Sequence, residues 1–223
     1  GELDMARSFP DGGRTRVNLF RQQGSVSAAI RLLADHIPSL DELSLPPVVA
    51  DFASYRSGIV LVTGETGSGK STTLAALLDR INHTRNAHII TLEDPIEYVY
   101  VPDRCIVNQR EIGADTRSYA DGLRAILRED PDVILIGEMR DLNTIETALT
   151  AAETGHLVFA TLHTNSAADA VDRMVNVFPA AQQQQIRLQL STTLRAVLSQ
   201  QLLPRRASSV LSTRPESRLI RTE

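Results

Sequence analysis

A glycine-rich loop stands between an apolar run and a helical pattern in this chain. The run, Ile59 to Val62, is typical of a strand buried on both faces of a parallel sheet, while Leu74, Leu77 and Leu78 recur at helical spacing. The loop between them matches the phosphate-binding pattern G-x-x-x-x-G-K-[ST] as Gly64-Glu65-Thr66-Gly67-Ser68-Gly69-Lys70-Ser71. Free N–H groups and the helix dipole favour a phosphate at such a helix start. The sequence therefore predicts an α/β fold with a phosphate-binding loop.

Lys70 is the only lysine among the 23 lysine and arginine residues. A slim ammonium fits beneath a loop that wraps a triphosphate, whereas a planar guanidinium does not. We expect Lys70 to reach the β- and γ-phosphates of ATP and the Ser71 hydroxyl to ligate Mg²⁺. The residues assigned to the nucleotide are Gly64, Glu65, Thr66, Gly67, Ser68, Gly69, Lys70, Ser71 and Thr72. A glycine-rich turn without a ligand is the alternative, which the position of the only lysine disfavours.

Composition excludes several classes of protein. A formal charge of -4 gives no reason to expect nucleic acid as the main partner. Cys105 is the single cysteine, which excludes an internal disulfide and a multi-cysteine metal site, and its apolar neighbours favour a buried, inert thiol. The sequence has no run long enough for a membrane span and no signal-peptide pattern. With ATP as the ligand, we expect a cytoplasmic location.

Between residues 48 and 204, apolar runs alternate with helical patterns, which predicts a mostly parallel sheet with helices on its faces. The expected strands contain residues 59–62, 88–92, 105–108, 133–136 and 157–160. The expected helices cover 69–82, 117–129, 142–153, 167–177 and 181–202. Asp141 and Ser166 are expected helix N-caps. We therefore assign residues 48–204 to the P-loop nucleoside triphosphatase core.

The two ends of the chain differ from this core. Residues 1–37 hold short strand-like pieces, too few to close a sheet, so we expect the front of an N-terminal domain to be missing. Residues 38–47 are a proline-punctuated linker that is expected to carry a short helix. Residues 205–223 lack apolar periodicity and predict a disordered tail or a truncated continuation.

Carboxylates follow two of the predicted strands. The carboxyl ends of strands face the ligand in an open α/β sheet, so Glu138 is expected to hold metal-bound water or to orient the attacking one. It is therefore both a candidate base and a candidate Mg²⁺ ligand. Glu93 and Glu97 are expected to support the same metal and water network, since clustered carboxylates favour a nearby cation. An ordinary charged turn is the alternative for each, and Lys70 nearby disfavours it for Glu138.

Two histidines bracket the predicted strand at 157–160. His163 lies at its carboxyl end, where an imidazole can sense the γ-phosphate. His156 lies at the opposite end and is expected to be structural. A shared metal ion is disfavoured because a whole strand separates the two side chains.

Four segments, in this order and spacing, resemble the motifs of the secretion-ATPase superfamily of hexameric motors. They are the phosphate loop, Glu93 to Glu97, Gly137 to Asp141, and Gly155 to Thr164, which look like the Walker A, Asp box, Walker B and His box. Within the superfamily, the chain is most similar to the type IV pilus retraction ATPases of twitching motility. The segments that match nearly residue for residue are Asn108 to Glu111, Leu127 to Asp132 and Thr150 to His156. The resemblance covers residues 14–204.

The resemblance implies a RecA-like core preceded by a PAS-like α/β domain, of which residues 1–37 would be a part. It implies a homo-hexamer that works at the inner-membrane pilus base, against the cytoplasmic face of the platform protein. Arg14, Arg16 and Arg31 match family arginines that reach a nucleotide. In the family the PAS-like domain packs on the neighbouring subunit's core, so the resemblance implies that Arg16 and Arg31 act in catalysis, and Arg14 in binding, at a neighbouring subunit's ATP.

Three classes of function stay open. The first is an ATP-hydrolysing ring motor that powers pilus retraction. The second is the pilus-assembly or type II secretion motor, whose relatives commonly carry a four-cysteine insertion that one cysteine cannot supply. The third is a non-catalytic ATP-binding fragment, because the chain departs from the family at both ends. A GTPase is disfavoured because its N-K-x-D motif needs a second lysine.

Overall fold

The computed structural model describes residues 2–9, 14–33, 36–203 and 219–220. Its strands are β1 (Leu3–Ser8), β2 (Arg14–Gln22), β3 (Ser25–Leu32), β4 (Gly58–Thr63), β5 (His88–Glu93), β6 (Ile106–Glu111), β7 (Val133–Ile136), β8 (Leu157–Leu162), β9 (Leu194–Gln201) and β10 (Leu219–Ile220). Its helices are α1 (Val48–Asp51), the 3-10 helix η1 (Phe52–Ser54), α2 (Lys70–Thr84), α3 (Tyr119–Ile126), α4 (Leu142–Glu153), α5 (Ala167–Asn176) and α6 (Ala180–Thr193).

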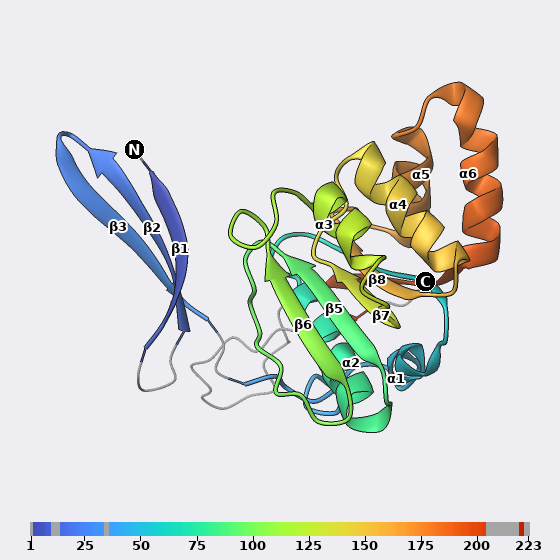
Figure 1. Ribbon diagram of the computed structural model, residues 1–223, viewed down its shortest axis with the longest axis horizontal. Helices are drawn as coiled ribbons and strands as arrows, with labels where there is room; N and C mark the ends of the chain where they lie inside the picture. Colours follow the sequence, from blue (N-terminus) through green and yellow to red (C-terminus); the bar gives the residue numbers. More distant parts are fainter. Residues whose placement is uncertain (1, 10–13, 34–35, 204–218, 221–223) are drawn as a thin grey trace.

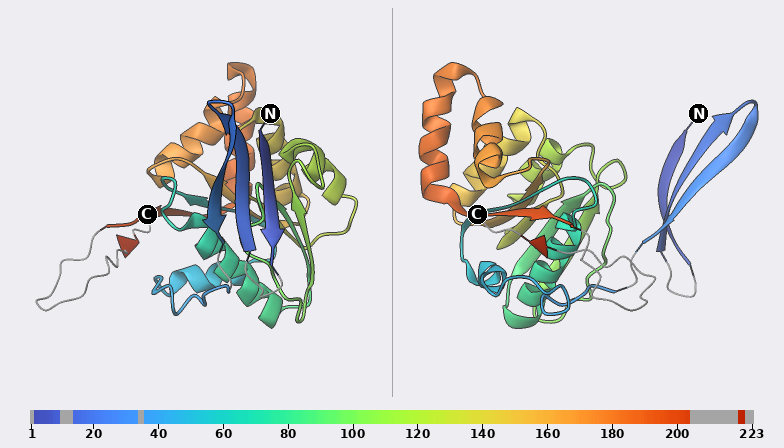
Figure 2. Two further views of the ribbon diagram at one scale, coloured as in Figure 1. Left: turned by 90° about the vertical axis from the view of Figure 1, so that its left-hand side faces the viewer. Right: turned by 180° about the vertical axis from the view of Figure 1, so that it is seen from behind.

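The strands form two separate sheets (Figure 1). A three-stranded antiparallel sheet, ordered β1-β2-β3, stands beside the larger part of the molecule (Figure 2). The larger sheet has the order β10-β9-β4-β8-β7-β5-β6, and its strand pairs are parallel except for β10 with β9. The predicted α/β fold with a mostly parallel sheet is therefore confirmed.

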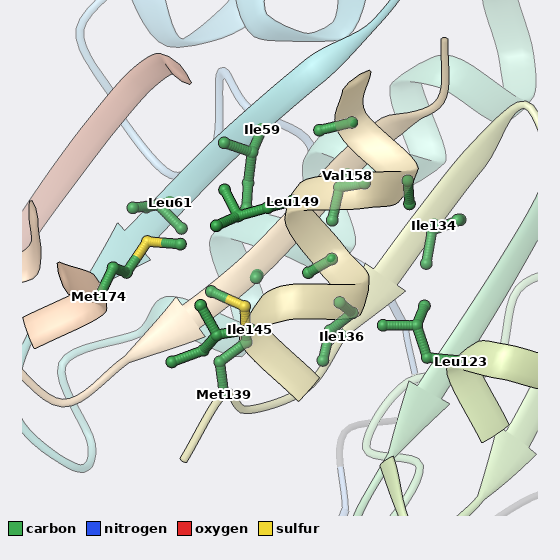
Figure 3. Packing of buried hydrophobic residues seen from close by; sticks show 14 of the residues in the cluster. Ile59, Leu61, Leu123, Ile134, Ile136, Met139, Ile145, Leu149, Val158 and Met174 are labelled. Carbon is green, nitrogen blue, oxygen red and sulfur yellow. The ribbon is translucent and has the colours of Figure 1, made fainter. Parts of the chain in front are cut away.

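The core lies on both faces of the larger sheet because side chains alternate along its strands. Ile59 and Leu61 of β4 join the cluster under α3, α4, α5 and α6, whereas Val60 and Val62 join the cluster over α1, η1 and α2. Figure 3 shows Leu149 of α4 packed beside Ile59 in the first cluster. Buried on both faces, β4 holds the phosphate loop at a fixed position.

Capping residues start two helices where the sequence predicts them. The Asp141 carboxylate accepts a hydrogen bond from the Thr144 N–H at the start of α4, at 3.0 Å. Ser166 accepts one from the Asp169 N–H at the start of α5, at 3.1 Å. A side-chain acceptor at this position satisfies an N–H that has no partner inside the helix. Both predicted N-caps are confirmed.

The predicted helix at 181–202 is wrong, because α6 ends at Thr193 and β9 follows at once. Its apolar residues fit helical spacing, yet from Leu194 onward the chain pairs in parallel with β4. Hydroxyls weaken the last turn of the helix: Thr192 and Thr193 donate to the carbonyl of Gln189 at 2.9 and 2.7 Å. Such residues compete with the helical backbone, and the open edge of β4 gives the following segment its partners.

The segment at 38–47 differs from the predicted linker with a short helix. It forms a turn at residues 40–44, and the helix begins only at Val48, after two prolines. Leu40 and Leu43 are buried against the core beside Val49. This segment is therefore packed onto the core through its leucines.

Parts of the predicted N-terminal and C-terminal zones fall outside the described residues. The strand-like pieces near the N-terminus form β2 and β3, and β1 completes their sheet. Of the predicted tail, residues 205–218 and 221–223 are not described, while Leu219 and Ile220 pair with β9. Among the described residues, no helix has both the length and the apolar character needed to cross a bilayer.

Candidate functional site

A cavity of about 360 Å³ opens where the carboxyl ends of β4, β5, β7 and β8 meet. Parallel pairing brings these ends to one edge of the sheet, so loops far apart in the sequence face the same space. The residues from the larger part of the molecule that line it are Thr66, Gly67, Lys70, Ser71, Leu74, Ala75, Glu93, Asp94, Pro95, Glu97, Tyr98, Tyr100, Tyr119, Leu135, Gly137, Glu138, Arg140, Thr161 and His163. The predicted acids and the histidine are thus brought to the lysine.

The phosphate loop closes around the Lys70 ammonium. Its Nζ donates to the carbonyls of Gly64 and Glu65 at 2.8 and 2.9 Å. Burial lowers the pKa of Lys70, and the negative charges of Glu138 and Glu97 partly oppose this shift. Gly69 precedes α2 with a φ of 90°, a left-handed conformation that favours glycine. The loop therefore presents a buried cation at a helix N-terminus, as an anion site requires.

Glu138 and His163 form a pair beside this cation. The Glu138 Oε1 lies 3.2 Å from the His163 Nε2, and the Arg140 Nε donates to the same oxygen. The Glu138 side chain is 18% exposed and that of His163 is 42% exposed, so both reach solvent in the cavity. The backbone beneath Glu138 is fixed, because the Gly137 N–H donates to Leu92 at 2.8 Å and the Thr161 hydroxyl donates to the Gly137 carbonyl. This arrangement can hold a water molecule against a carboxylate.

Glu93 is held more tightly than Glu138. Its Oε1 accepts hydrogen bonds from the Thr91 hydroxyl at 2.6 Å and from the Gln109 Nε2 at 3.1 Å. Burial raises the pKa of Glu93, and these two hydrogen bonds partly oppose the increase. Because the Glu93 Oε1 already accepts two hydrogen bonds from neighbouring side chains, Glu93 is better suited to support the metal and water network than to act as the base.

Tyr119 is a site residue that the sequence analysis missed. Burial, followed by the negative charges of Asp94 and Glu138, raises its pKa well above the ordinary value. The hydroxyl therefore keeps its proton and can donate a hydrogen bond into the cavity. A Cβ added at Gly137 would lie 3.0 Å from the Tyr119 oxygen, so the hydroxyl would have to shift by a few tenths of an ångström. No local pattern marks Tyr119, which is brought in by the packing of α3.

Arg140 and Tyr98 were also missed. Arg140 lies within the segment 137–141 and could have been singled out there, since it is two residues from Glu138. The Tyr98 hydroxyl lies 3.0 Å from the Thr72 Oγ1, which joins the loop after β5 to the start of α2. This contact depends on residues 26 positions apart in the sequence.

Arg16 and Arg31 line the cavity of their own chain, and their role at a neighbouring subunit's ATP stays a prediction. The packed segment at 38–47 leaves the small sheet beside its own core. The two arginines are directly opposite in the register of β2 and β3. Like charges in this position repel each other, so a bound anion would stabilise both. Arg14 does not line the cavity, and its guanidinium donates to the Ile96 carbonyl at 3.4 Å.

The residues present fit a magnesium ion that is bound together with a phosphate. Among the described residues, no group of three or more histidines, cysteines or acids could hold a metal ion alone. Mg²⁺ in nucleotide sites needs only one or two protein ligands, with phosphates and water supplying the rest. The Ser71 hydroxyl and the Glu138 carboxylate line the same cavity and offer such ligands.

The chain is similar to known proteins along most of its length. Residues 21–221 match the family described as "Type II/IV secretion system protein". The chain is 55% identical over 202 residues to the uncharacterized protein YggR of Escherichia coli K12, across 91% of this chain and 62% of YggR. It is 52% identical over 202 residues to the type IV pilus retraction ATPase PilT of Pseudomonas aeruginosa PAO1, across 91% of this chain and 59% of PilT.

A solved structure of the pilus retraction motor PilT with bound ADP has a TM-score of 0.92 and 53% identity, and the match covers 99% of this chain and 62% of that one. The RecA-like core expected from the sequence agrees with this likeness. The chain spans 59% to 62% of the length of these three relatives.

Proposed function

The chain belongs to the family of type II/IV secretion system proteins, and from this premise we propose that it hydrolyses ATP as part of a motor that retracts type IV pili. One observation carries the proposal. The buried ammonium of Lys70 and the Glu138–His163 pair share one cavity at the carboxyl edge of the sheet. The retraction role follows from the similarity to PilT, which is known as a type IV pilus retraction ATPase.

The proposed chemistry is phosphoryl transfer from ATP to water. The loop N–H groups and Lys70 hold the phosphates and stabilise the charge that grows on them. The water oxygen attacks the γ-phosphorus while the Glu138 carboxylate accepts a proton from that water. The bond between the γ-phosphorus and the oxygen that bridges to the β-phosphate breaks. His163 orients Glu138 and contacts the γ-phosphate. Glu93 supports the network from the side, and the products are ADP and inorganic phosphate.

Mg²⁺ would be held by Ser71 and Glu138 together with the phosphates. When bound, it would neutralise phosphate charge. Ser71 is exposed at the first turn of α2, so its hydroxyl can turn toward the cavity.

Assembly and location follow the family as further parts of the proposal. We assign residues 1–37 to part of a PAS-like domain, 38–47 to its connection, 48–204 to the ATPase core and 205–223 to a tail. The full motor is a homo-hexamer on the cytoplasmic side of the inner membrane, where it contacts the platform protein of the pilus base. The three-stranded sheet supplies Arg16 and Arg31 to the nucleotide.

The Glu138→Gln variant is expected to bind ATP and to hydrolyse it roughly 10²-fold more slowly, which is the scale for loss of a positioned base. Glutamine keeps the shape of the side chain but cannot accept the proton. Phosphate release and ATP binding are measured on the same preparation. The control is Glu146→Gln, which changes an exposed acid on α4. Parent-rate hydrolysis in Glu138→Gln would transfer the role of base to Glu93 or Glu97.

A further inference from the structure

The first residue of α3, Tyr119, has a fixed position at the edge of the cavity. The helix starts at a cap, because the Ser118 hydroxyl accepts a hydrogen bond from the Asp121 N–H at 3.1 Å. On the inner face of the same helix, Leu123 and Ile126 are fully buried in the core cluster. The cap and these two contacts hold the backbone of Tyr119 against the sheet.

The Tyr119 hydroxyl lies over Gly137, which directly follows β7. Its oxygen is 3.0 Å from the position that a Cβ on Gly137 would take. The half-buried ring packs against the core cluster, and the residue also lines the cavity. Because Glu138 is the next residue after Gly137 and lines the same cavity, the phenol and this carboxylate border one space.

This hydroxyl makes no hydrogen bond to any other residue in the part of the chain that the structure describes. It is nevertheless surrounded by acids: after burial, the negative charges of Asp94, Glu138 and Glu93 raise the pKa of Tyr119. Polar groups that face each other without direct contact are commonly joined by water. A water molecule between them can accept a hydrogen bond from the phenol and donate one to the Glu138 carboxylate.

The Glu138 carboxylate has one oxygen available for such a water molecule. Its Oε1 accepts a hydrogen bond from the Arg140 Nε and lies 3.2 Å from the His163 Nε2. None of the described residues donates a hydrogen bond to its Oε2. An ionised carboxylate accepts hydrogen bonds at both oxygens, so Oε2 is left to interact with water in the cavity.

We propose that the Tyr119 hydroxyl orients the attacking water molecule by donating a hydrogen bond to it, while that water donates one to the Glu138 Oε2. This inference rests on the proposed ATP hydrolysis. A water molecule held in this way uses one lone pair for Tyr119 and one proton for Glu138. Its second lone pair is left to attack the γ-phosphorus of a nucleotide on the phosphate loop. During the reaction the water proton moves to Glu138, and the phenol keeps its own proton.

The Tyr119→Phe variant removes the hydroxyl and keeps the ring that packs against the core. It is expected to slow phosphate release at saturating ATP by about 2- to 10-fold, the range for one net hydrogen bond, with unchanged affinity for ATP. The control is Tyr55→Phe, which removes the hydroxyl of a half-buried tyrosine that stacks on Phe52 and does not line the cavity. This control is expected to hydrolyse ATP at the parent rate.

Two nucleotide complexes separate the orientation of water from a structural role of Tyr119. ADP with aluminium fluoride mimics the transition state and includes the attacking water, whereas ADP with beryllium fluoride mimics bound ATP. A group that acts on the attacking water contributes more to the first complex than to the second. Tyr119→Phe is therefore expected to weaken the aluminium fluoride complex by the same factor as the rate and to leave the beryllium fluoride complex unchanged.

Equal rates of phosphate release in Tyr119→Phe and Tyr55→Phe overturn the role of Tyr119 and leave hydrolysis at the Glu138 site standing. A slower rate without selective weakening of the aluminium fluoride complex overturns it as well. Absence of phosphate release from the parent chain overturns the proposed hydrolysis and this inference together.

Discussion

The Lys70→Ala variant is expected to lose tight ATP binding. Lys70 is the only lysine in the chain, and its buried ammonium is held at the centre of the loop. A hydrogen bond to a charged group contributes about 1.5–3 kcal/mol, so losing contacts to two phosphates should weaken binding by roughly 100-fold or more. Titration calorimetry with ATP measures the effect. Arg16 and Arg31 cannot replace the ammonium because they face the cavity from the other sheet.

The matched control for this variant is Arg80→Ala, which removes an exposed cation farther along the same helix. It is expected to bind ATP as the parent does. Far-ultraviolet circular dichroism of both variants checks that α2 still forms. Parent-like ATP affinity in a folded Lys70→Ala protein would show that residues 64–71 are a turn without a phosphate ligand.

The Arg16→Ala/Arg31→Ala double variant is expected to lower the rate of ATP hydrolysis by roughly 10³-fold, the lower end of the effect of an arginine on phosphoryl transfer. The two guanidinium groups lie opposite each other at the cavity, where the charge of the transferring phosphoryl group would offset their repulsion. Steady-state phosphate release is the measurement. Arg21→Ala is the control, since it removes an exposed arginine from the same strand. Equal rates in the double variant and this control would remove both arginines from the catalytic assignment.

Mixing variant subunits then tests whether Arg16 and Arg31 act on the nucleotide of their own chain or on that of a neighbouring subunit. Because Arg16 and Arg31 line the cavity of their own chain, mixing the double variant with Lys70→Ala is expected to restore no activity. Each mixed chain would still lack one part of its own site. Restored activity on mixing would instead support the prediction from sequence, in which the arginines reach a neighbouring subunit.

The sequence predicts the site best where chemistry and local pattern coincide. The phosphate loop lies between a strand and a helix as predicted, and β7 and β8 carry Glu138 and His163 to its side. These residues follow continuous apolar runs, so strand ends and side-chain roles can be inferred together. Parallel pairing then gathers them at one edge without any further information.

The sequence fails where distant contacts decide the structure. Leu194 to Leu198 fit a helix by spacing, but the open edge of β4 makes them a strand. β9 also places Gln200 beside the phosphate loop, a contact that the wrongly predicted helix does not suggest. Tyr119 likewise reaches Gly137 only through the packing of α3. The positions of Arg16 and Arg31 in the sequence do not indicate whether these side chains face the core of their own chain or that of a neighbouring subunit.

The most direct test of the account is phosphate release by the unaltered chain at saturating ATP and Mg²⁺. Many turnovers per chain are expected, and they should be abolished by Lys70→Ala and slowed by Glu138→Gln. Parallel measurement of bound nucleotide separates catalysis from binding. Stoichiometric ATP binding with no phosphate release would contradict the account and make this chain a nucleotide-binding module without catalysis.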